Sequence, residues 1–457
     1  MHRRPALPTL FALGALVCSC SWSRFDDLRD DPPVVRLDAP VDIDRFGARL
    51  ASAPLDKGGG LILVGGNPET SLPLASYVIA DDRPSTSPED RGFCGEACVS
   101  GRTISAWRTV ADHQGPCFLI GVGTRSGVTG LIGRCSDGTD FALDVPHDNT
   151  QSQAEPTPRE VVDAALAGHA YPGFIQHAVS AEPTPVLAAA APSARVAWFY
   201  AAGSLTPVSL PTPAAVLADD VDDFGAAVAV MLLSNGDHLL AVSAPGSADP
   251  ATTGRVWLYR VDSADQVTSW GCLSGSFGFG ATMLAGAAVG DASDDLLVAD
   301  AQSVSVFDGS VLASHVQPQD CPEATTPWGV VSCQQAEGVS GCGRAPFSFG
   351  RAITLGDLDG DGAAELIVGM GEADVDGEGG AGAVLVYRFD GTSRSAGLAA
   401  VARIAAPSPG QGLGSSVTTV RIGRRDVLAA GSPGADSVFL FYCSALGGAG
   451  RDSFRCP

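Results

Sequence analysis

Residues 356–369, GDLDGDGAAELIVG, carry acidic side chains at alternate positions. Asp357, Asp359 and Asp361 can direct three carboxylate oxygens at one point, and Gly362 permits the tight turn that this arrangement needs. Hard oxygen ligands of this kind suit calcium. The alternative is an acidic turn, rich in Asp and Gly, that binds no ion.

The segment does not continue as an EF-hand. An EF-hand loop needs a bidentate Glu at its twelfth position, where this chain has Val368. The residues before the loop alternate in polarity (FGRAITLGD), and a short apolar run (ELIVGM) follows it. These patterns favour two strands over two helices, so the sequence predicts an ion loop inside a β-hairpin.

Similar units recur along the chain. Pentapeptides of one type (FGARL, FGAAV, FGATM, FGRAI and the variant LGSSV) begin at Phe46, Phe224, Phe279, Phe349 and Leu413. Each precedes two β-rich runs, such as LLAVSAPG and RVWLYRVD. Successive starts from Phe224 onward are 55, 70 and 64 residues apart, whereas 178 residues separate Phe46 from Phe224. Two degenerate units, at 117–137 and 186–200, fill that gap and bring the total to seven.

The loop and the repeats together resemble FG-GAP repeats, the units of the integrin α-chain β-propeller, whose ion loop has the pattern D-x-D-x-D-G-x-x-D. Glu365 stands where that pattern has its last Asp. The resemblance implies a calcium site with side-chain ligands from Asp357, Asp359, Asp361 and Glu365 and a carbonyl ligand from Ala363.

A unit of about 62 residues holds four strands and their turns. The chain is therefore expected to be all-β, a seven-bladed β-propeller of four-stranded antiparallel blades over residues 33–446. Residues 33–39 parallel the strand that precedes the last unit, so they are expected to close the last blade as an N-terminal strand. Residues 311–348 form an insertion and 447–457 a C-terminal tail. A β-sandwich array is the alternative, but it would need capping units that we do not find in the sequence.

The first 20 residues resemble a bacterial lipoprotein signal peptide, with a basic pair, a short apolar segment and the sequence VCSC. Cys20 is the expected lipidation site, and residues 21–32 are expected to form a polar tether. The alternative is ordinary cleavage with no lipid. The chain is thus expected to be exported to the cell envelope, either anchored to the outer membrane or periplasmic, with the lipid as its only membrane contact.

Ten of the 12 cysteines remain after Cys18 and Cys20 are set aside, an even number that suits disulfides in an exported protein. Zinc is disfavoured because the chain lacks paired short Cys or Cys/His spacings. Closeness along hairpins and loops suggests the following pairs: Cys94 with Cys98, Cys117 with Cys135, Cys333 with Cys342, Cys443 with Cys456, and Cys272 with Cys321.

The composition narrows the function. A formal net charge of −23 repels phosphate backbones, so no nucleic-acid partner is expected. The sequence has no H-E-x-x-H or G-x-S-x-G, and its seven histidines are scattered singly. We therefore expect a non-enzymatic binding or adhesion module, stabilised by Ca²⁺, with a protein or glycan ligand on its loop face. A lectin-like propeller is one alternative, and a hydrolase or lyase whose residues meet only in space is the other.

Tryptophans help to separate these alternatives. The insertion 311–348 carries Trp328 and three cysteines, which makes it the first candidate contact surface; the alternative is a disulfide-tied structural loop. Trp198 and Trp257 lie inside β-rich runs, so they are expected to fill the packing between blades rather than bind a sugar.

Overall fold

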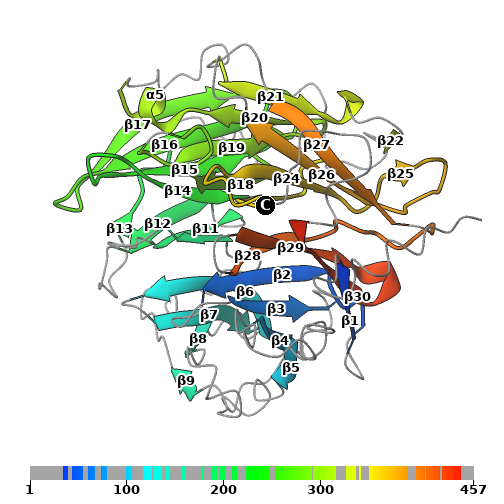
Figure 1. Cartoon of the computed structure of the whole chain (residues 1–457). Coiled ribbons are helices and arrows are strands. Elements are labelled where there is room, and N and C mark those ends of the chain that lie inside the picture. Colours follow the sequence, from blue (N-terminus) through cyan, green and yellow to red (C-terminus); the bar gives the residue numbers. More distant parts are fainter. Residues whose placement is uncertain are drawn as a thin grey trace, which may run out of the picture.

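The computed structural model describes much of the 457-residue chain and shows an all-β protein, as predicted (Figure 1). The described residues are 34–39, 44–54, 60–66, 74–79, 99–104, 117–125, 128–135, 140–144, 157–159, 176–179, 187–192, 195–200, 208–213, 223–246, 253–290, 292–314, 326–335, 339–340, 349–389, 398–406, 408–422 and 425–443. The named helical elements within them are short: α5 (Gly309–Ser314) and the 3-10 turns η4 (Cys333–Gln335) and η5 (Pro433–Ala435).

The strands form four-stranded antiparallel sheets, which we number along the chain. Sheet 1 contains β2 (Arg49–Pro54), β3 (Gly60–Gly65), β4 (Leu74–Ile79) and β5 (Val99–Ile104). Sheet 2 contains β6 (Cys117–Arg125), β7 (Val128–Cys135), β8 (Asp140–Asp144) and β9 (Thr157–Arg159). Sheet 3 contains β10 (Gln176–Val179), β11 (Leu187–Ala191), β12 (Val196–Tyr200) and β13 (Val208–Ser209). The two degenerate units therefore form strands where the sequence predicted them.

The remaining sheets have clearer sequence signatures. Sheet 4 contains β14 (Val228–Leu232), β15 (His238–Ala244), β16 (Arg255–Val261) and β17 (Val267–Ser274). Sheet 5 contains β18 (Thr282–Gly286), β19 (Asp295–Ala299), β20 (Ser303–Phe307) and β21 (Gly329–Ser332). Sheet 6 contains β23 (Ala352–Gly356), β24 (Glu365–Met370), β26 (Ala383–Phe389) and β27 (Leu398–Ala405). Sheet 7 contains β28 (Val417–Ile422), β29 (Arg425–Ser432), β30 (Ser437–Phe441) and β1 (Val34–Asp38).

The N-terminal strand β1 belongs to the last sheet. It pairs antiparallel with β30, and Val34 lies opposite Phe441 while Asp38 lies opposite Ser437. The guanidinium of Arg36 donates to the Ser437 hydroxyl at 3.0 Å, which adds a side-chain contact to the ladder. Residues 34–38 thus occupy the outer position of sheet 7, where the sequence predicted a strand.

The first strands of the sheets contact one another in a fixed order. The contacting pairs are β2 with β6, β6 with β10, β10 with β14, β14 with β18, β18 with β23, β23 with β28 and β28 with β2. Apolar side chains fill the space between the sheets; one buried cluster, for example, joins Val304, Leu366 and Leu428 of sheets 5, 6 and 7. Sheets 5, 6 and 7 therefore bury apolar side chains against one another, as packed layers of secondary structure must.

The Phe-Gly elements explain how successive sheets dock. The Phe349 side chain is fully buried, and Gly350 has a φ of +74°. A Cβ on Gly350 would lie 2.9 Å from the Cβ of Ala299 in sheet 5, so only glycine permits this approach. A Cβ on Gly47 of sheet 1 would lie 2.6 Å from the Ser437 carbonyl oxygen of sheet 7. The element thus fixes each of these sheets against the one before it, and for sheet 1 that neighbour is sheet 7.

The described parts of the insertion 311–348 pack into the fold. Its β21 is the fourth strand of sheet 5, and its β22 (Val339–Ser340) pairs with β25 (Asp374–Val375) of the β24–β26 connection. Trp328 is only 7% exposed and packs against Phe389, with ring centroids 5.7 Å apart. The Trp328 ring is thus buried between sheets 5 and 6 and offers no exposed aromatic surface; that the insertion is a contact surface stays a prediction.

Cysteine pairing is only partly visible. Cys272, Cys333 and Cys443 are disulfide-bonded, and their partners lie outside the described residues. Backbone register places Cys117 directly opposite Cys135 in the β6–β7 ladder. The five predicted pairs remain predictions. The predicted signal peptide (1–20, with Cys20), tether (21–32) and C-terminal tail (447–457) also lie outside the described residues. Within the described residues, no helix has the length and hydropathy to span a membrane.

Candidate metal centre

The acidic loop joins the first two strands of sheet 6. β23 and β24 pair antiparallel up to Gly356 and Glu365, which lie opposite each other, so residues 357–364 form the hairpin connection. The sequence predicted this hairpin from its two flanking β-patterns, and the prediction is confirmed. The second strand is fully buried along its length, which gives the loop a rigid base.

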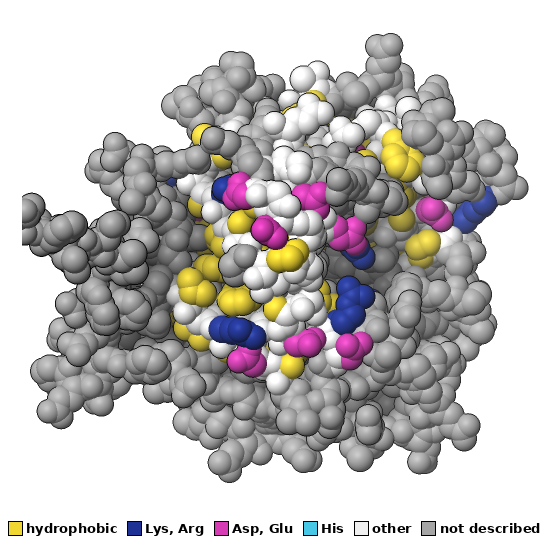
Figure 2. Space-filling model, turned by 90° about the vertical axis from the view of Figure 1, so that its right-hand side faces the viewer, with side chains coloured by type: hydrophobic (Ala, Val, Ile, Leu, Met, Phe, Trp, Pro, Cys, Tyr) yellow, Lys and Arg dark blue, Asp and Glu magenta, His cyan; other side chains and the backbone are white. Residues whose placement is uncertain are grey.

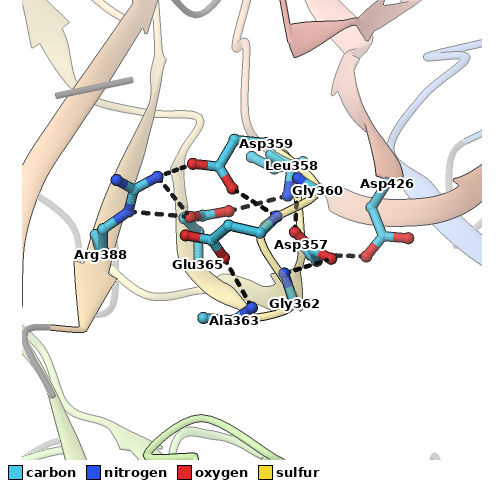
Figure 3. Close-up of polar contacts among 10 residues, drawn as sticks. Asp357, Leu358, Asp359, Gly360, Gly362, Ala363, Glu365, Arg388 and Asp426 are labelled. Carbon is cyan, nitrogen blue, oxygen red and sulfur yellow. Dashed lines mark hydrogen bonds and ion pairs between the residues drawn. The ribbon is translucent and has the colours of Figure 1, made fainter. Parts of the chain in front are cut away.

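The loop folds around its own carboxylates (Figure 3). Asp357 accepts from the backbone N–H groups of Gly360 at 2.7 Å and Gly362 at 3.2 Å. Asp359 accepts from the N–H of Asp361 at 3.2 Å, and Asp361 accepts from that of Ala363 at 2.8 Å. These short-range bonds are the ones that Asp residues make in tight turns. They turn all three aspartates toward the inside of the loop.

The three aspartates converge. One carboxylate oxygen from each of Asp357, Asp359 and Asp361 lies within 4.8 Å of the other two. Calcium binds oxygens at 2.3–2.6 Å, so oxygens around one ion are separated by at most about twice that length. The spacing and the all-oxygen donor set therefore fit a calcium ion. Asp361 is exposed, which leaves one side of the set open to water ligands.

Glu365 is placed differently from the three aspartates. Its side chain is fully buried, and one oxygen accepts from the Leu358 N–H at 2.9 Å. Its other oxygen lies 3.3 Å from both Nε and Nη2 of Arg388 on β26. The same Nη2 contacts Asp359. Glu365 thus links the loop to β24 and β26 through its contacts with the Leu358 N–H and Arg388. Its carboxylate is not among the three that converge.

Sheet 7 contacts the loop from the other side. The Asp357 N–H donates to the Asp426 carboxylate at 2.7 Å, and the Asp426 N–H donates to the Asp357 carbonyl at 2.8 Å. Arg421 lies 3.5 Å from the Asp357 carboxylate and 3.4 Å from that of Asp426. This reciprocal pair fixes the start of the acidic loop to the start of β29 in the neighbouring sheet.

Negative charge is in excess at the centre. Five carboxyl groups, those of the three aspartates with Glu365 and Asp426, face two guanidinium groups, Arg388 and Arg421. Burial raises the pKa of Glu365 to about 7; the Leu358 N–H opposes this rise, and nearby aspartates add to it. Burial also raises the pKa of Asp426. Both shifts mean that ionised carboxyls are disfavoured here without more positive charge, which a divalent cation would supply.

A cavity of about 370 Å³ adjoins the loop. Leu284 and Ala285 of β18 and Leu355 of β23 form its apolar wall, and Arg421 and Asp426 form its polar end. Asp357 also lines this cavity, which is open to solvent, so water can reach that carboxylate.

Sequence reasoning found the aspartates but missed their supports. Arg388, Arg421 and Asp426 contact the loop from other strands, which a pattern search along one segment does not reveal. One signal was present, because Tyr387-Arg388 repeats the Tyr259-Arg260 pair at the same place in sheet 4. The β-bulge before each tyrosine shows that the two positions correspond in the structure.

Comparison with known families identifies this unit. The FG-GAP repeat family matches residues 349–387, which span β23, the ion loop, β24 and most of β26. The chain contains an FG-GAP repeat. Together with the four-stranded antiparallel sheets, this match confirms the predicted resemblance to FG-GAP β-propellers. Among curated proteins, none matches the sequence.

Solved structures with similar folds have low sequence identity to this chain. The crystal structure of Chaetomium thermophilum Raptor is 12% identical, with a TM-score of 0.45, over 89% of this chain and 28% of that one. A chain in the crystal structure of the Mitotic Checkpoint Complex is 12% identical, with a TM-score of 0.46, over 89% and 91%. The Dos1 propeller is 10% identical, with a TM-score of 0.42, over 86% and 78%. The chain thus spans less than a third of the Raptor chain that it matches.

Proposed function

We propose that this protein is a non-enzymatic binding module, built as a calcium-stabilised β-propeller. The observation that carries the proposal is the convergence of Asp357, Asp359 and Asp361 inside the hairpin that matches the FG-GAP repeat. All three carboxylates are held by backbone N–H groups of their own loop, so the ion would brace the hairpin. The role proposed for calcium is therefore structural.

The proposed ligands are the carboxylates of Asp357, Asp359 and Asp361, with water at the exposed side. Glu365 and the Ala363 carbonyl, which the family resemblance implied as further ligands, remain predictions. With so few protein ligands, the dissociation constant should lie in the extracellular range, about 0.1 to 1 mM. At 10 mM calcium, a dissociation constant of about 0.1 mM corresponds to about 2.7 kcal/mol of added stability.

Calorimetry and thermal unfolding test the calcium site. The parent should bind one calcium ion per chain, and its melting temperature should rise with calcium and fall with chelator. Asp359→Ala should lose both responses. Glu372→Ala is the matched control, because it removes a carboxylate from an exposed ion pair with Arg351 on the same sheet. If Asp359→Ala responds to calcium as the parent does, the site is wrongly assigned.

For the architecture, we propose a closed seven-bladed ring. The cyclic contacts among the first strands and the pairing of β1 with β30 support it. Deletion of residues 21–40 removes the closing strand and exposes an edge of sheet 7, so it should cause aggregation or a large loss of stability. Deletion of residues 21–31 leaves β1 intact and should be harmless. Equal melting temperatures for the two truncations would contradict ring closure.

The proposed partner is a protein, bound on the face that carries β22 and β25. Two exposed ion pairs lie beside the β24–β26 connection, which contains β25. They join Arg351 to Glu372 and Arg403 to Asp376. Figure 2 shows charged side chains of both signs around hydrophobic ones on the side of the molecule that it draws. Mixed surfaces of this kind are typical of non-obligate protein interfaces. Trp198, Trp257 and Trp328 are buried, so these three rings offer no platform for a sugar.

Affinity capture tests the partner. The parent should retain a partner protein that Arg403→Glu loses, whereas Arg36→Glu, which alters an exposed arginine on sheet 7, should retain it. Binding to a glycan array with no protein partner would favour the lectin alternative. Turnover on esterase, lyase or glycosidase substrates would contradict a non-enzymatic role.

Export and lipidation at Cys20 complete the proposal. The lipoprotein-type sequence of residues 1–20 is its support. Metabolic labelling with a fatty acid should mark the parent and not Cys20→Ala. A labelled Cys20→Ala protein would exclude this anchor site.

A further inference from the structure

The arginine beneath the ion loop contacts a carboxylate that calcium needs. Arg388 reaches across from β26, and its Nη2 contacts Asp359, one of the three converging aspartates (Figure 3). The same guanidinium lies 3.3 Å from Glu365, which is fully buried. The side chain of Arg388 is 29% exposed, so it is largely enclosed by the site. A protein cation therefore already neutralises part of the loop.

The same arrangement occurs in sheet 4, where there is no ion loop. Arg260 is in the position of Arg388 on the third strand, and it binds Asp237 of the short first hairpin through Nε at 2.9 Å and Nη2 at 2.5 Å. The side chain of Asp237 is only 12% exposed. The Asn235 amide also donates to the same Asp237 oxygen at 3.0 Å. In both sheets 4 and 6, an arginine on the third strand is thus a counter-cation of the first hairpin.

We propose that Arg388 sets the calcium affinity of the loop by competing with the ion for Asp359. The inference rests on the calcium site proposed above. When calcium is absent, the guanidinium holds Asp359 and Glu365 and keeps the loop folded. When calcium binds, Asp359 turns from Arg388 to the ion, and Glu365 keeps the arginine.

Two physical consequences follow. A positive charge next to a cation site weakens cation binding, because like charges repel and because the two cations compete for the charge of Asp359. The same charge also stabilises the empty loop, because it neutralises carboxylates that would otherwise repel one another. Loss of the charge should therefore strengthen calcium binding and weaken the calcium-free fold.

Calorimetric titration of the full chain with calcium chloride tests the inference. Arg388→Met keeps the apolar stem and removes the charge, so it should bind calcium about tenfold more tightly than the parent. In chelator its melting temperature should be lower than that of the parent, and saturating calcium should remove the difference. Arg260→Met is the matched control, and its calcium affinity should equal that of the parent.

A second variant keeps the test decisive if Arg388→Met does not fold. Arg388→Gln retains a donor for Glu365 without the charge, and it should show the same tightening. A parent that binds calcium while the variants bind it no more tightly would overturn the competition and leave the calcium site intact. No calcium binding at millimolar concentration by the parent or by either variant would overturn both the site and the inference. Binding by the variants alone would support the competition.

Discussion

Sheets 4 and 6 contain the same repeat unit with two different first hairpins. In sheet 4, a short turn between β14 and β15 presents one buried carboxylate, Asp237, to Arg260, whose guanidinium also stacks over Trp270 at 4.9 Å. In sheet 6, Asp359 of a longer loop and Glu365 at the start of β24 both contact Arg388. The arginine is common to both hairpins and the excess of acid is not. The short hairpin pairs Asp237 with one guanidinium, whereas the five carboxyl groups at the long hairpin share two guanidinium groups, those of Arg388 and Arg421.

Sheet 5 shows a third arrangement. Asp295 starts its second strand opposite Gly286, as Glu365 does opposite Gly356. Its buried carboxylate accepts from three backbone N–H groups, those of Ala288, Val289 and Gly309, at 2.7–3.0 Å. Three backbone donors thus hold this carboxylate in the unit whose acidic segment, GDASDDLL, lacks the alternate spacing of residues 357–361.

The largest effect is expected from Arg260→Met in sheet 4. The substitution leaves Asp237 enclosed without its main partner and should destabilise the fold by about 3 kcal/mol. Because no ion loop is present there, calcium should not restore the lost stability. Chemical denaturation in chelator and in calcium measures both quantities. If calcium restored the stability of Arg260→Met, the hairpin of sheet 4 would also respond to calcium and would not differ from that of sheet 6.

Asp295→Asn should have the next largest effect. An amide oxygen accepts more weakly than a carboxylate, and the amide nitrogen would face backbone donors, so a loss of about 2 kcal/mol is expected. The calcium affinity should be unchanged. If instead this variant binds calcium more weakly, sheet 5 and the ion loop are coupled and cannot be treated as separate arrangements.

Two glycines, one in each hairpin, have nearly the same backbone conformation and surroundings, so they allow a direct comparison. Gly236 in the sheet 4 turn and Gly362 in the ion loop have φ values of +85° and +92°, and a Cβ on either would meet nothing within 4 Å. Alanine at each should therefore cost about 1 kcal/mol, from the left-handed backbone alone. Unfolding in chelator should give equal losses. A much larger loss for Gly362→Ala would show that the empty loop is held more tightly than the turn.

The smallest effect on stability is expected from Asp361→Asn. This side chain is exposed, so the free energy of unfolding in chelator should change by less than about 0.5 kcal/mol. Calcium affinity should nevertheless fall, since a charged ligand is lost. A calcium titration followed by melting temperature separates the two effects. An unchanged calcium response would remove Asp361 from the ligand set.

Much of the fold could be predicted because each repeat unit has a recognisable pattern within a short stretch of sequence. Alternating and apolar runs gave the strands of sheet 6, and the likeness of residues 33–39 to an internal strand gave the outer strand of sheet 7. The loop aspartates were also local, since their convergence follows from spacing within one turn.

The supports of the site could not be predicted in the same way. Arg388 and Asp426 reach the loop from a different strand and a different sheet, so their roles depend on tertiary register. Glu365 is a predicted ligand from its place in the motif, and its contacts with Arg388 and the Leu358 N–H could not be predicted from that place. Trp328 lies in a long insertion, where an exposed ring was plausible. It directly precedes β21 of sheet 5, and its ring packs against Phe389 of sheet 6.

The pairing of β1 with β30 also constrains how the chain folds. Val34 and Phe441 are partners at opposite ends of the sequence, so this ladder is among the most non-local contacts that the molecule makes. During synthesis at about 5 to 20 residues per second, residues 34–38 emerge about 20 to 80 s before their partner strand exists. Contacts of such long range form late and slowly. Over that interval the first strand has no ladder to join, and the outer edge of sheet 7 is completed only after nearly the whole chain has been made.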